Sequence, residues 1–389
     1  MKTLKTHPYL RGWPWVLAAL FITALYFHLR PQAFHLILID CGVYATAIDT
    51  WMAGGDPYRF VSGADLPFVY PPVFLYVGAA IARLLTPHTG WIIYVTLHLL
   101  ATASIPWILY RFYLPRATTG PLAVYALYFA APGFVGMLAT ETGNIAVMAY
   151  ALLLLTAVPG LRKNKWVYFY VAVLLCATAK PSFLPFLLLP VLFGSRQLLW
   201  AILTGSTAAA GLLSQRWIAP HLYARFTETL AKRTTEVGDV GVSVFGLVFH
   251  VLHNLHLPGQ LILPALAYGA MALTILVQLV LLRGRNRTPT WCALVLLGVL
   301  FLNPRLEYYD FCVAFPLAFF VFVRTVPLRY GIPLYLALAL PALFFLVHHR
   351  DSVANGGLGA IAILFFWAAS CFRLLRTPAP EAPPLQSHP

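Results

Sequence analysis

Four aspartates lie close together near the start of the chain, and one of them is placed to act as a base. Asp40 ends the apolar run HLILI, so its carboxylate is expected at the edge of an apolar environment, where partial desolvation raises its proton affinity. A carboxylate of this kind suits general-base catalysis. The alternative is a cap on the helix expected over YATAIDTWMA, because aspartate is favoured at caps. The composition GGDPY predicts a turn at Asp56, and Asp49 and Asp65 are expected to be solvated.

Lys180 is the only charged residue between Lys165 and Arg196, within the segment CATAKPSFLPF. Ionisable side chains in such apolar surroundings are costly and usually functional. Pro181 is expected to end the preceding helix. A lysine at a broken helix suits a phosphate group, whose negative charge offsets the cost of removing the ammonium from water. The alternative is that Lys180 extends its flexible side chain to the membrane surface.

Two short polar segments, ATETGN (139–144) and NPRLEYYD (303–310), interrupt apolar blocks. In the second segment, Arg305 offers the forked guanidinium that binds phosphate or carboxylate in a bidentate manner. The other polar side chains could bind sugar hydroxyls or hold Arg305; they are Glu141, Glu307, Tyr309 and Asp310. The alternative is that these groups pair with one another and only close the turns.

No metal or nucleotide site is predicted. His250, His253 and His256 recur every three residues, but such positions drift by about 120° around a helix, so a helix at the membrane surface is the better interpretation. No glycine-rich phosphate loop or metalloprotease motif is present in a suitable context. The five cysteines form no CxxC pair and imply no disulfide framework.

The composition indicates an integral membrane protein. Of the 389 residues, 60% are hydrophobic and only 10% are charged, whereas soluble domains carry about 25% charged residues. The net charge of +14 does not indicate a nucleic-acid partner, because lysine and arginine cluster in short breaks between apolar blocks. The positive-inside rule assigns these breaks to the cytoplasm; they are RFYLPR (111–116), LRKNK (161–165), RGRNR (283–287) and RTVPLR (324–329).

A layout of twelve spans places every one of these basic breaks inside and all acidic residues except Glu381 outside. Both termini are then cytoplasmic. Two spans are short and must tilt or thin the membrane. The predicted spans are 13–29, 90–110, 121–139, 145–159, 167–179, 183–193, 199–216, 261–282, 291–302, 311–323, 331–347 and 357–373.

Two long outer loops result from this layout, at residues 30–89 and 217–260. The apolar stretch 70–85 is interpreted as a helix at the outer membrane surface, because counting it as a span would move RFYLPR and LRKNK outside. Residues 1–373 are expected to form one transmembrane domain. The Pro-rich segment 374–389 is expected to be a disordered cytoplasmic tail.

Together these motifs resemble glycosyltransferase family 87, the polyprenyl-phosphate-mannose-dependent α-mannosyltransferases of the GT-C fold class. The resemblance runs from about residue 36 to 320. It rests on several short motifs that follow one another along the chain in the order typical of the family. They are D-x-x-V-Y (Asp40 to Tyr44), G-x-D-P-Y (Gly54 to Tyr58), Y-P-P (Tyr70 to Pro72), TETGN (Thr140 to Asn144), A-K-P-S (Ala179 to Ser182) and P-x-x-x-Y-Y-D (Pro304 to Asp310).

The resemblance implies an all-α GT-C bundle with long outer loops after the first and seventh spans. It also implies Asp40 as the base and Lys180 as a ligand of the donor phosphate. Arg305 is expected to bind the same phosphate because of its forked guanidinium. Tyr44, Tyr70 and Asn144 are expected to bind substrate. Tyr308 and Tyr309 occupy positions that a histidine pair fills in some family members, which leaves the sugar open.

The implied reaction moves a sugar, most simply mannose, from a polyprenyl-phosphate-sugar to a lipid or glycan acceptor, with inversion and without a cofactor. The expected location is the inner membrane of a prokaryote, with the site on the periplasmic side. A transporter would show internal repeats and a midplane site, and neither is seen in the sequence. A polysaccharide ligase or lipid-carrier flippase remains an alternative, since it would share the phosphate-binding cations without needing a base at Asp40.

Overall fold

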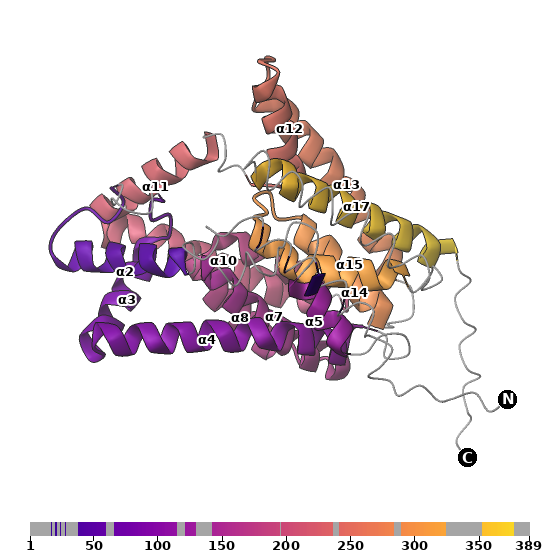
Figure 1. The fold of residues 1–389 in the computed structure, drawn as a ribbon, viewed down its shortest axis with the longest axis horizontal. Coiled ribbons are helices and arrows are strands. Elements are labelled where there is room, and N and C mark those ends of the chain that lie inside the picture. Colours follow the sequence, from indigo (N-terminus) through magenta and orange to yellow (C-terminus); the bar gives the residue numbers. More distant parts are fainter. Residues whose placement is uncertain are drawn as a thin grey trace.

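The computed structural model describes eight stretches of the chain and single positions between residues 17 and 28. The described stretches are 38–59, 66–114, 121–129, 142–194, 196–235, 241–283, 289–323 and 352–376. Within them the chain is helical and contains no strand (Figure 1). The all-α prediction is therefore confirmed for this part of the chain.

Within the described residues, four helices are long and apolar enough to cross a membrane, and each lies on a predicted span. The first is α4 (Pro87–Ile108), which a π-helical turn, η3 (Leu109–Tyr113), extends. The others are α7 (Ile145–Lys163), α10 (Arg196–Ile218) and α13 (Ile262–Arg283).

Several other predicted spans are short helices. α8 (Val167–Ala179), α14 (Pro289–Phe301) and α15 (Phe311–Val323) have 13 residues each. At 1.5 Å per residue each is about 20 Å long, against a hydrocarbon core of about 30 Å. The segment predicted at 183–193 is a 3₁₀ helix, η4 (Pro181–Leu187), followed by one turn, α9 (Leu188–Val191).

The remaining predicted spans are covered to different extents by the described residues. α5 (Pro121–Phe129) covers the start of the span predicted at 121–139, and α17 (Ser352–Arg376) covers the one at 357–373. Most of 13–29 and all of 331–347 lie outside the described residues, as does the tail from 377 onward. The total of twelve spans, the domain limits and the side of each loop therefore stay predictions.

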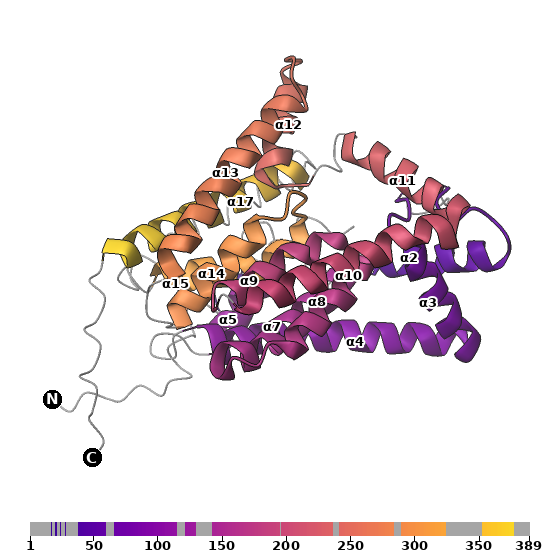
Figure 2. The ribbon, with the colours of Figure 1, turned by 180° about the vertical axis from the view of Figure 1, so that it is seen from behind.

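Three of the four helices in the predicted outer loops lie at one end of the bundle, whereas the fourth, α12 (Val244–Asn254), packs against α13. The first loop contains α2 (Ile39–Met52) and α3 (Pro72–Leu84), and the second contains α11 (Pro220–Thr235) and α12. Figures 1 and 2 show α2, α3 and α11 grouped beside the start of α4, and α11 contacts α3 directly. Two segments about 150 residues apart in sequence therefore share one end of the molecule.

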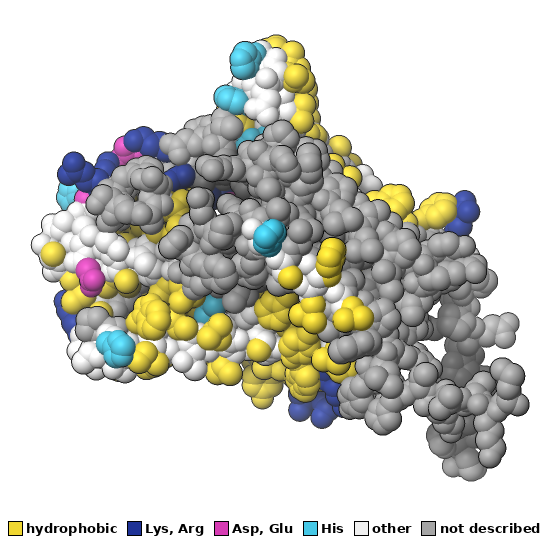
Figure 3. All heavy atoms as spheres, in the orientation of Figure 1, with side chains coloured by type: hydrophobic (Ala, Val, Ile, Leu, Met, Phe, Trp, Pro, Cys, Tyr) yellow, Lys and Arg dark blue, Asp and Glu magenta, His cyan; other side chains and the backbone are white. Residues whose placement is uncertain are grey.

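The core and the exposed apolar surface belong to different helices. α14 and α15 are buried almost completely, whereas α10 and α13 expose large apolar side chains along most of their length. On the face in Figure 3, apolar side chains cover α4, and the visible acidic side chains lie at the end that carries α2 and α11. Exposed apolar helix faces are what lipid contact requires, whereas a soluble protein rarely exposes so much contiguous apolar surface.

Local sequence explains where the bundle breaks. Pro181 disfavours helical geometry at the residue before it, so α8 ends at Ala179 and Lys180 is extended, with φ −144° and ψ 97°. Gly241 has φ +76°, and a Cβ there would collide with the carbonyl of Leu306. This close approach allows the Val242 amide to donate to the Leu306 carbonyl at 2.7 Å, which ties the second outer loop to the 303–310 segment.

Candidate active site

Asp40 is the second residue of α2 and does not cap it. The N-cap position is Leu38, in a left-handed conformation with φ 61°, and no side chain caps this helix end. The cap interpretation of Asp40 is therefore wrong. The Asp40 carboxylate instead accepts a hydrogen bond at Oδ2 from the side-chain amide of Asn144, at 2.7 Å. A carboxylate in the first turn is also favoured by the helix dipole.

Burial changes the acidity of Asp40. Desolvation raises its pKa to about 6, against the opposing effects of the Asn144 hydrogen bond and the positive charge of Lys180. At pH 7 the group is then largely ionised, yet it holds a proton more tightly than an ordinary aspartate does. A pKa just below the working pH is what a general base requires.

Two tyrosines lie beside this carboxylate. Tyr44 is four residues after Asp40, so both side chains lie on one face of α2. The hydroxyls of Tyr44 and Tyr70 lie 2.7 Å apart, and their rings are edge-to-face with centroids 5.1 Å apart. Asn144 also donates to the Tyr70 hydroxyl, at 3.3 Å. The two motifs D-x-x-V-Y and Y-P-P thus meet at Asn144.

An aromatic cluster packs against Tyr70 and fixes its position. Tyr58 donates from its hydroxyl to the Tyr70 carbonyl at 2.9 Å, and Phe68 and Phe74 pack against the Tyr70 ring. Phe226 of α11 packs into the same buried cluster, against Tyr58. The second outer loop therefore supports a residue of the first.

The Lys180 side chain contacts residues that are distant from it in sequence. Its ammonium donates to the Tyr309 hydroxyl at 2.8 Å and lies 4.3 Å from the centroid of the same ring. It also interacts electrostatically with Asp310, Glu307 and Asp40, which attract it, and with Arg305, which repels it. The ammonium is thus held among residues from other segments of the chain.

The 303–310 segment is closed by its own polar groups. Arg305 Nε pairs with Glu307 Oε1 at 3.2 Å, as the ion-pair alternative predicted, and the Arg305 side chain remains 30% exposed. Asp310 is buried; its two oxygens accept from the Tyr150 hydroxyl and the Glu307 amide, each at 2.7 Å. Burial raises the pKa of Asp310, against the pull of Lys180 and these two donors.

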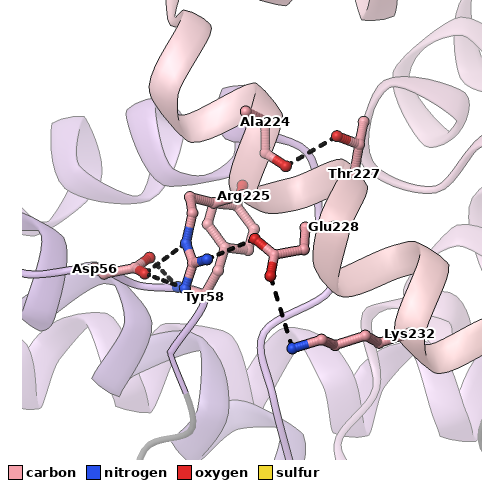
Figure 4. A network of polar contacts seen from close by, with 7 residues as sticks. All are labelled: Asp56, Tyr58, Ala224, Arg225, Thr227, Glu228 and Lys232. Carbon is pink, nitrogen blue, oxygen red and sulfur yellow. Dashed lines mark hydrogen bonds and ion pairs between the residues drawn. The ribbon is translucent and has the colours of Figure 1, made fainter.

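The other aspartates have different surroundings. Asp49 is exposed, as predicted. Asp56 accepts from the Tyr58 amide at 3.0 Å, which confirms a turn, and it also pairs with Arg225 of α11 at 2.8 Å (Figure 4). Asp65 lies outside the described residues, as does Glu141.

The three histidines are not grouped around a point. His250 is buried in α12, whereas His256 is exposed beyond the end of that helix. Among the described residues, no three His, Cys, Asp or Glu side chains are arranged to hold a metal ion.

Three supporting residues were not predicted from the sequence. Tyr150 holds Asp310, Tyr94 donates to the Gly143 carbonyl at 2.6 Å, and Arg225 joins the two outer loops. A lone tyrosine in the apolar run IAVMAYALLLL was a usable signal for Tyr150, because a buried hydroxyl needs a partner. No sequence feature pointed to the partner of Arg225.

Comparison with protein-family models matches residues 68–304, more than half of the chain, to glycosyltransferase family 87. The matched range contains Tyr70, Asn144 and Lys180 and ends at Pro304, so Asp40 and Arg305 lie on either side of it. Comparison with curated proteins gave no match, and neither did comparison with solved structures.

Proposed function

The chain belongs to glycosyltransferase family 87, and from this premise we propose that it moves a sugar, most simply mannose, from a polyprenyl-phosphate donor to an acceptor hydroxyl at the outer face of a membrane. The acceptor is a lipid or a glycan. The proposal combines the family, which supplies the reaction class, with the four long apolar helices, which fit a lipid-linked donor.

The observation that carries the proposal is the grouping of Asp40 with two cations, Lys180 and Arg305, beside the carboxylates of Glu307 and Asp310. Asp40 from α2, Lys180 from the break after α8 and Arg305 from the segment after α14 interact electrostatically within one site. A sugar phosphate needs a base on the acceptor side of C1 and positive charge on the phosphate side. This arrangement offers both.

In the proposed reaction Asp40 takes the proton of the acceptor hydroxyl as its oxygen forms a bond to C1 of the sugar. The bond from C1 to the phosphate oxygen breaks, and the electron pair leaves with the lipid phosphate. A single displacement of this kind inverts the configuration at C1. The leaving phosphate monoester is stable at neutral pH, so the proposal requires neither a nucleotide nor a metal.

Lys180 and Arg305 are proposed to bind the donor phosphate and to stabilise the charge that it gains. Lys180 is held by Tyr309, a neutral partner that a phosphate oxygen can replace. Arg305 is partly exposed, so a ligand can reach its guanidinium, whose several N–H donors suit a phosphate. Electrostatic stabilisation of this type is commonly the largest single contribution to an enzymatic rate enhancement.

The remaining site residues are proposed to hold the sugar and the acceptor. Tyr309 is partly exposed and offers a ring and a hydroxyl suited to a sugar, and Glu307 and Glu141 are further candidates from the sequence. Tyr44 and Tyr70 are buried, so their proposed part is to support Asn144 and Asp40 beside the substrate. Asp310 is better suited to a second role, because both of its oxygens already accept hydrogen bonds within the protein. It acts as a fixed counter-charge for Lys180.

We place the site on the outer side of a prokaryotic inner membrane, with both termini in the cytoplasm. The support is the distribution of charge along the sequence, because basic residues gather in the short breaks and acidic residues in the long loops. Asp40 on α2 shares one end of the bundle with α3 of the first long loop and α11 of the second.

The test is incubation of the purified protein with polyprenyl-phosphate-mannose and candidate acceptors, followed by mass spectrometry. A mannosylated acceptor in the wild type, and none in Asp40→Asn, supports the proposal. A product formed equally by both would favour a ligase or carrier function that needs no base. Trials with glucosyl and galactosyl donors would show whether mannose is the sugar.

A further inference from the structure

The side-chain amide of Asn144 is fixed at both ends. Its Oδ1 accepts from the Ala146 amide at 2.9 Å and so caps α7. Because Oδ1 already accepts, Nδ2 is the donor, and it donates to Asp40 Oδ2 at 2.7 Å and to the Tyr70 hydroxyl at 3.3 Å. Asn144 is buried, with 5% of its surface exposed, so water does not compete for these contacts.

The turn before Asn144 brings α7 to the start of α2. Gly143 has φ +67°, and a Cβ there would lie 2.8 Å from Cδ2 of Leu38, the residue at the N-cap position of α2. The Tyr94 hydroxyl donates to the Gly143 carbonyl at 2.6 Å and holds the turn in place. Only glycine combines this φ with such a close approach.

Resting on the proposed function, we propose that Asn144 is a positioning residue for the base: it orients the Asp40 carboxylate so that Oδ1 receives the proton. Among the described residues no hydrogen bond to Asp40 Oδ1 is present, whereas Oδ2 is held by Asn144. The amide has no basic lone pair for the acceptor proton, so it directs the carboxylate without replacing it.

Tyr44 and Tyr70 restrict the movement of the hydrogen-bonded pair Asn144 and Asp40. Tyr70 accepts the second N–H of Asn144, and the Tyr44 hydroxyl accepts from the Ile145 amide at 3.4 Å. These contacts join α2, the Y-P-P segment and the start of α7 through the side chains of Asp40, Tyr44, Tyr70 and Asn144. A carboxylate held in this way loses little freedom when the acceptor binds.

Two substitutions distinguish a residue that only caps α7 from one that also positions the Asp40 carboxylate. Serine and aspartate cap helices about as well as asparagine does. The serine hydroxyl ends one bond short of the position of Asn144 Nδ2, and an ionised aspartate has no donor, so neither replaces the hydrogen bond to Asp40. Asn144→Ser therefore keeps a cap and removes the donor. Asn144→Asp keeps a cap and places a second carboxylate against Asp40, which disfavours ionisation of both.

The pH dependence of the transfer rate shows in which direction the Asn144 substitutions shift the pKa of Asp40. Asp40 acts when deprotonated, so the rate rises with pH through its pKa of about 6. The Asn144 donor lowers that pKa, so its removal raises the pKa and moves the rising limb to higher pH. Asn144→Asp is expected to move the limb further than Asn144→Ser does. Loss of orientation lowers the plateau by about 10-fold to 100-fold.

The experiment measures kcat against pH, thermal stability and the titration of Asp40 itself in wild type and both variants. The titration is read from the pH dependence of carbodiimide modification of Asp40, quantified by mass spectrometry, because the reagent attacks the protonated carboxyl. We expect both variants to fold with a lowered unfolding midpoint, because each loses a buried donor, and with Asp40 titrating at higher pH than in wild type.

The outcomes are distinct. An unshifted Asp40 titration and an unchanged plateau in Asn144→Ser would overturn the inference and leave Asn144 as a cap. A second outcome is that the variants shift the Asp40 titration but the wild type transfers no sugar. That result would overturn the proposed function and leave the control of Asp40 by Asn144 in place. Asp49→Asn, a change at an exposed carboxylate, is the control and should leave the Asp40 titration unchanged.

Discussion

The ammonium of Lys180 lies 2.8 Å from the hydroxyl of Tyr309, 129 residues later in the chain. This contact joins the break after α8 to the turn that precedes α15, and it places the lysine among Asp310, Glu307 and Arg305. The hydrogen-bond partner of the ammonium is a neutral hydroxyl, which a ligand oxygen can replace, while Asp310 stays close enough to balance its charge. The donor phosphate is the ligand that the proposed reaction supplies.

Lys180→Ala should weaken donor binding sharply. Truncation of one partner of a buried charge pair costs about 2–5 kcal/mol, which is about 30-fold to 5,000-fold in affinity. Lys180→Arg should restore part of this loss, because arginine keeps the charge but differs in shape and hydration. The measurement is calorimetric titration with polyprenyl-phosphate-mannose. Lys163→Ala, at an exposed position, is the control, and equal affinity in Lys180→Ala and wild type would exclude the proposed role.

Tyr150→Phe should lower thermal stability. The Tyr150 hydroxyl donates to Asp310 at 2.7 Å in a buried setting, so its removal leaves one carboxylate oxygen without that donor. A buried group deprived of its partner costs about 1–3 kcal/mol. Thermal unfolding in detergent checks this. Tyr125→Phe, which removes a hydroxyl from a less buried site, should change the midpoint less, and the opposite order would refute the account of Asp310.

Reversal of the charge at Arg225 should loosen α11. Figure 4 shows Arg225 between Asp56 of the first outer loop and Glu228 of its own helix. Arg225→Asp places like charges together, so we expect faster hydrogen exchange in α11. The double variant Asp56→Arg with Arg225→Asp restores opposite charges and should slow exchange again. The same exchange rate in the single and double variants would mean that the pair does not hold the loops together.

The topology gives a separate prediction. In a variant without native cysteines, Asp49→Cys should react with a membrane-impermeant reagent in intact cells, because Asp49 is exposed on the first outer loop. Lys163→Cys, at the exposed end of α7, should react only after permeabilisation. Labelling of Lys163→Cys in intact cells would reverse the proposed orientation.

The sequence predicted the parts of the site better than the contacts among them. Charge distribution and apolar length located the four long helices, and motif order selected Asp40, Lys180 and Arg305, which the structure brings together. Periodicity does not determine how far one helix is rotated against another. The donor to Asp40 therefore had to be seen in the structure, and Asn144 was predicted only as a substrate ligand.

Two local interpretations failed or were incomplete for physical reasons. Asp40 was a plausible cap by residue type, but the left-handed conformation of Leu38 starts α2 two residues earlier. Asp56 was predicted as a turn residue, and the turn is present, but its ion pair with Arg225 depends on the docking of α11. Such docking is a property of packing between loops distant in sequence, and composition does not encode it.

The transfer rate of Asp40→Asn, measured beside its thermal stability, tests the central claim most directly. Asparagine keeps the size of the side chain and an oxygen that can accept from Asn144, but it cannot take the acceptor proton. The account predicts a normal unfolding midpoint, normal donor affinity and a rate lower by about 10²–10⁴, the usual contribution of a positioned acid or base. Asp49→Asn should transfer at the wild-type rate. Near-normal transfer by Asp40→Asn in a stable protein would contradict the account.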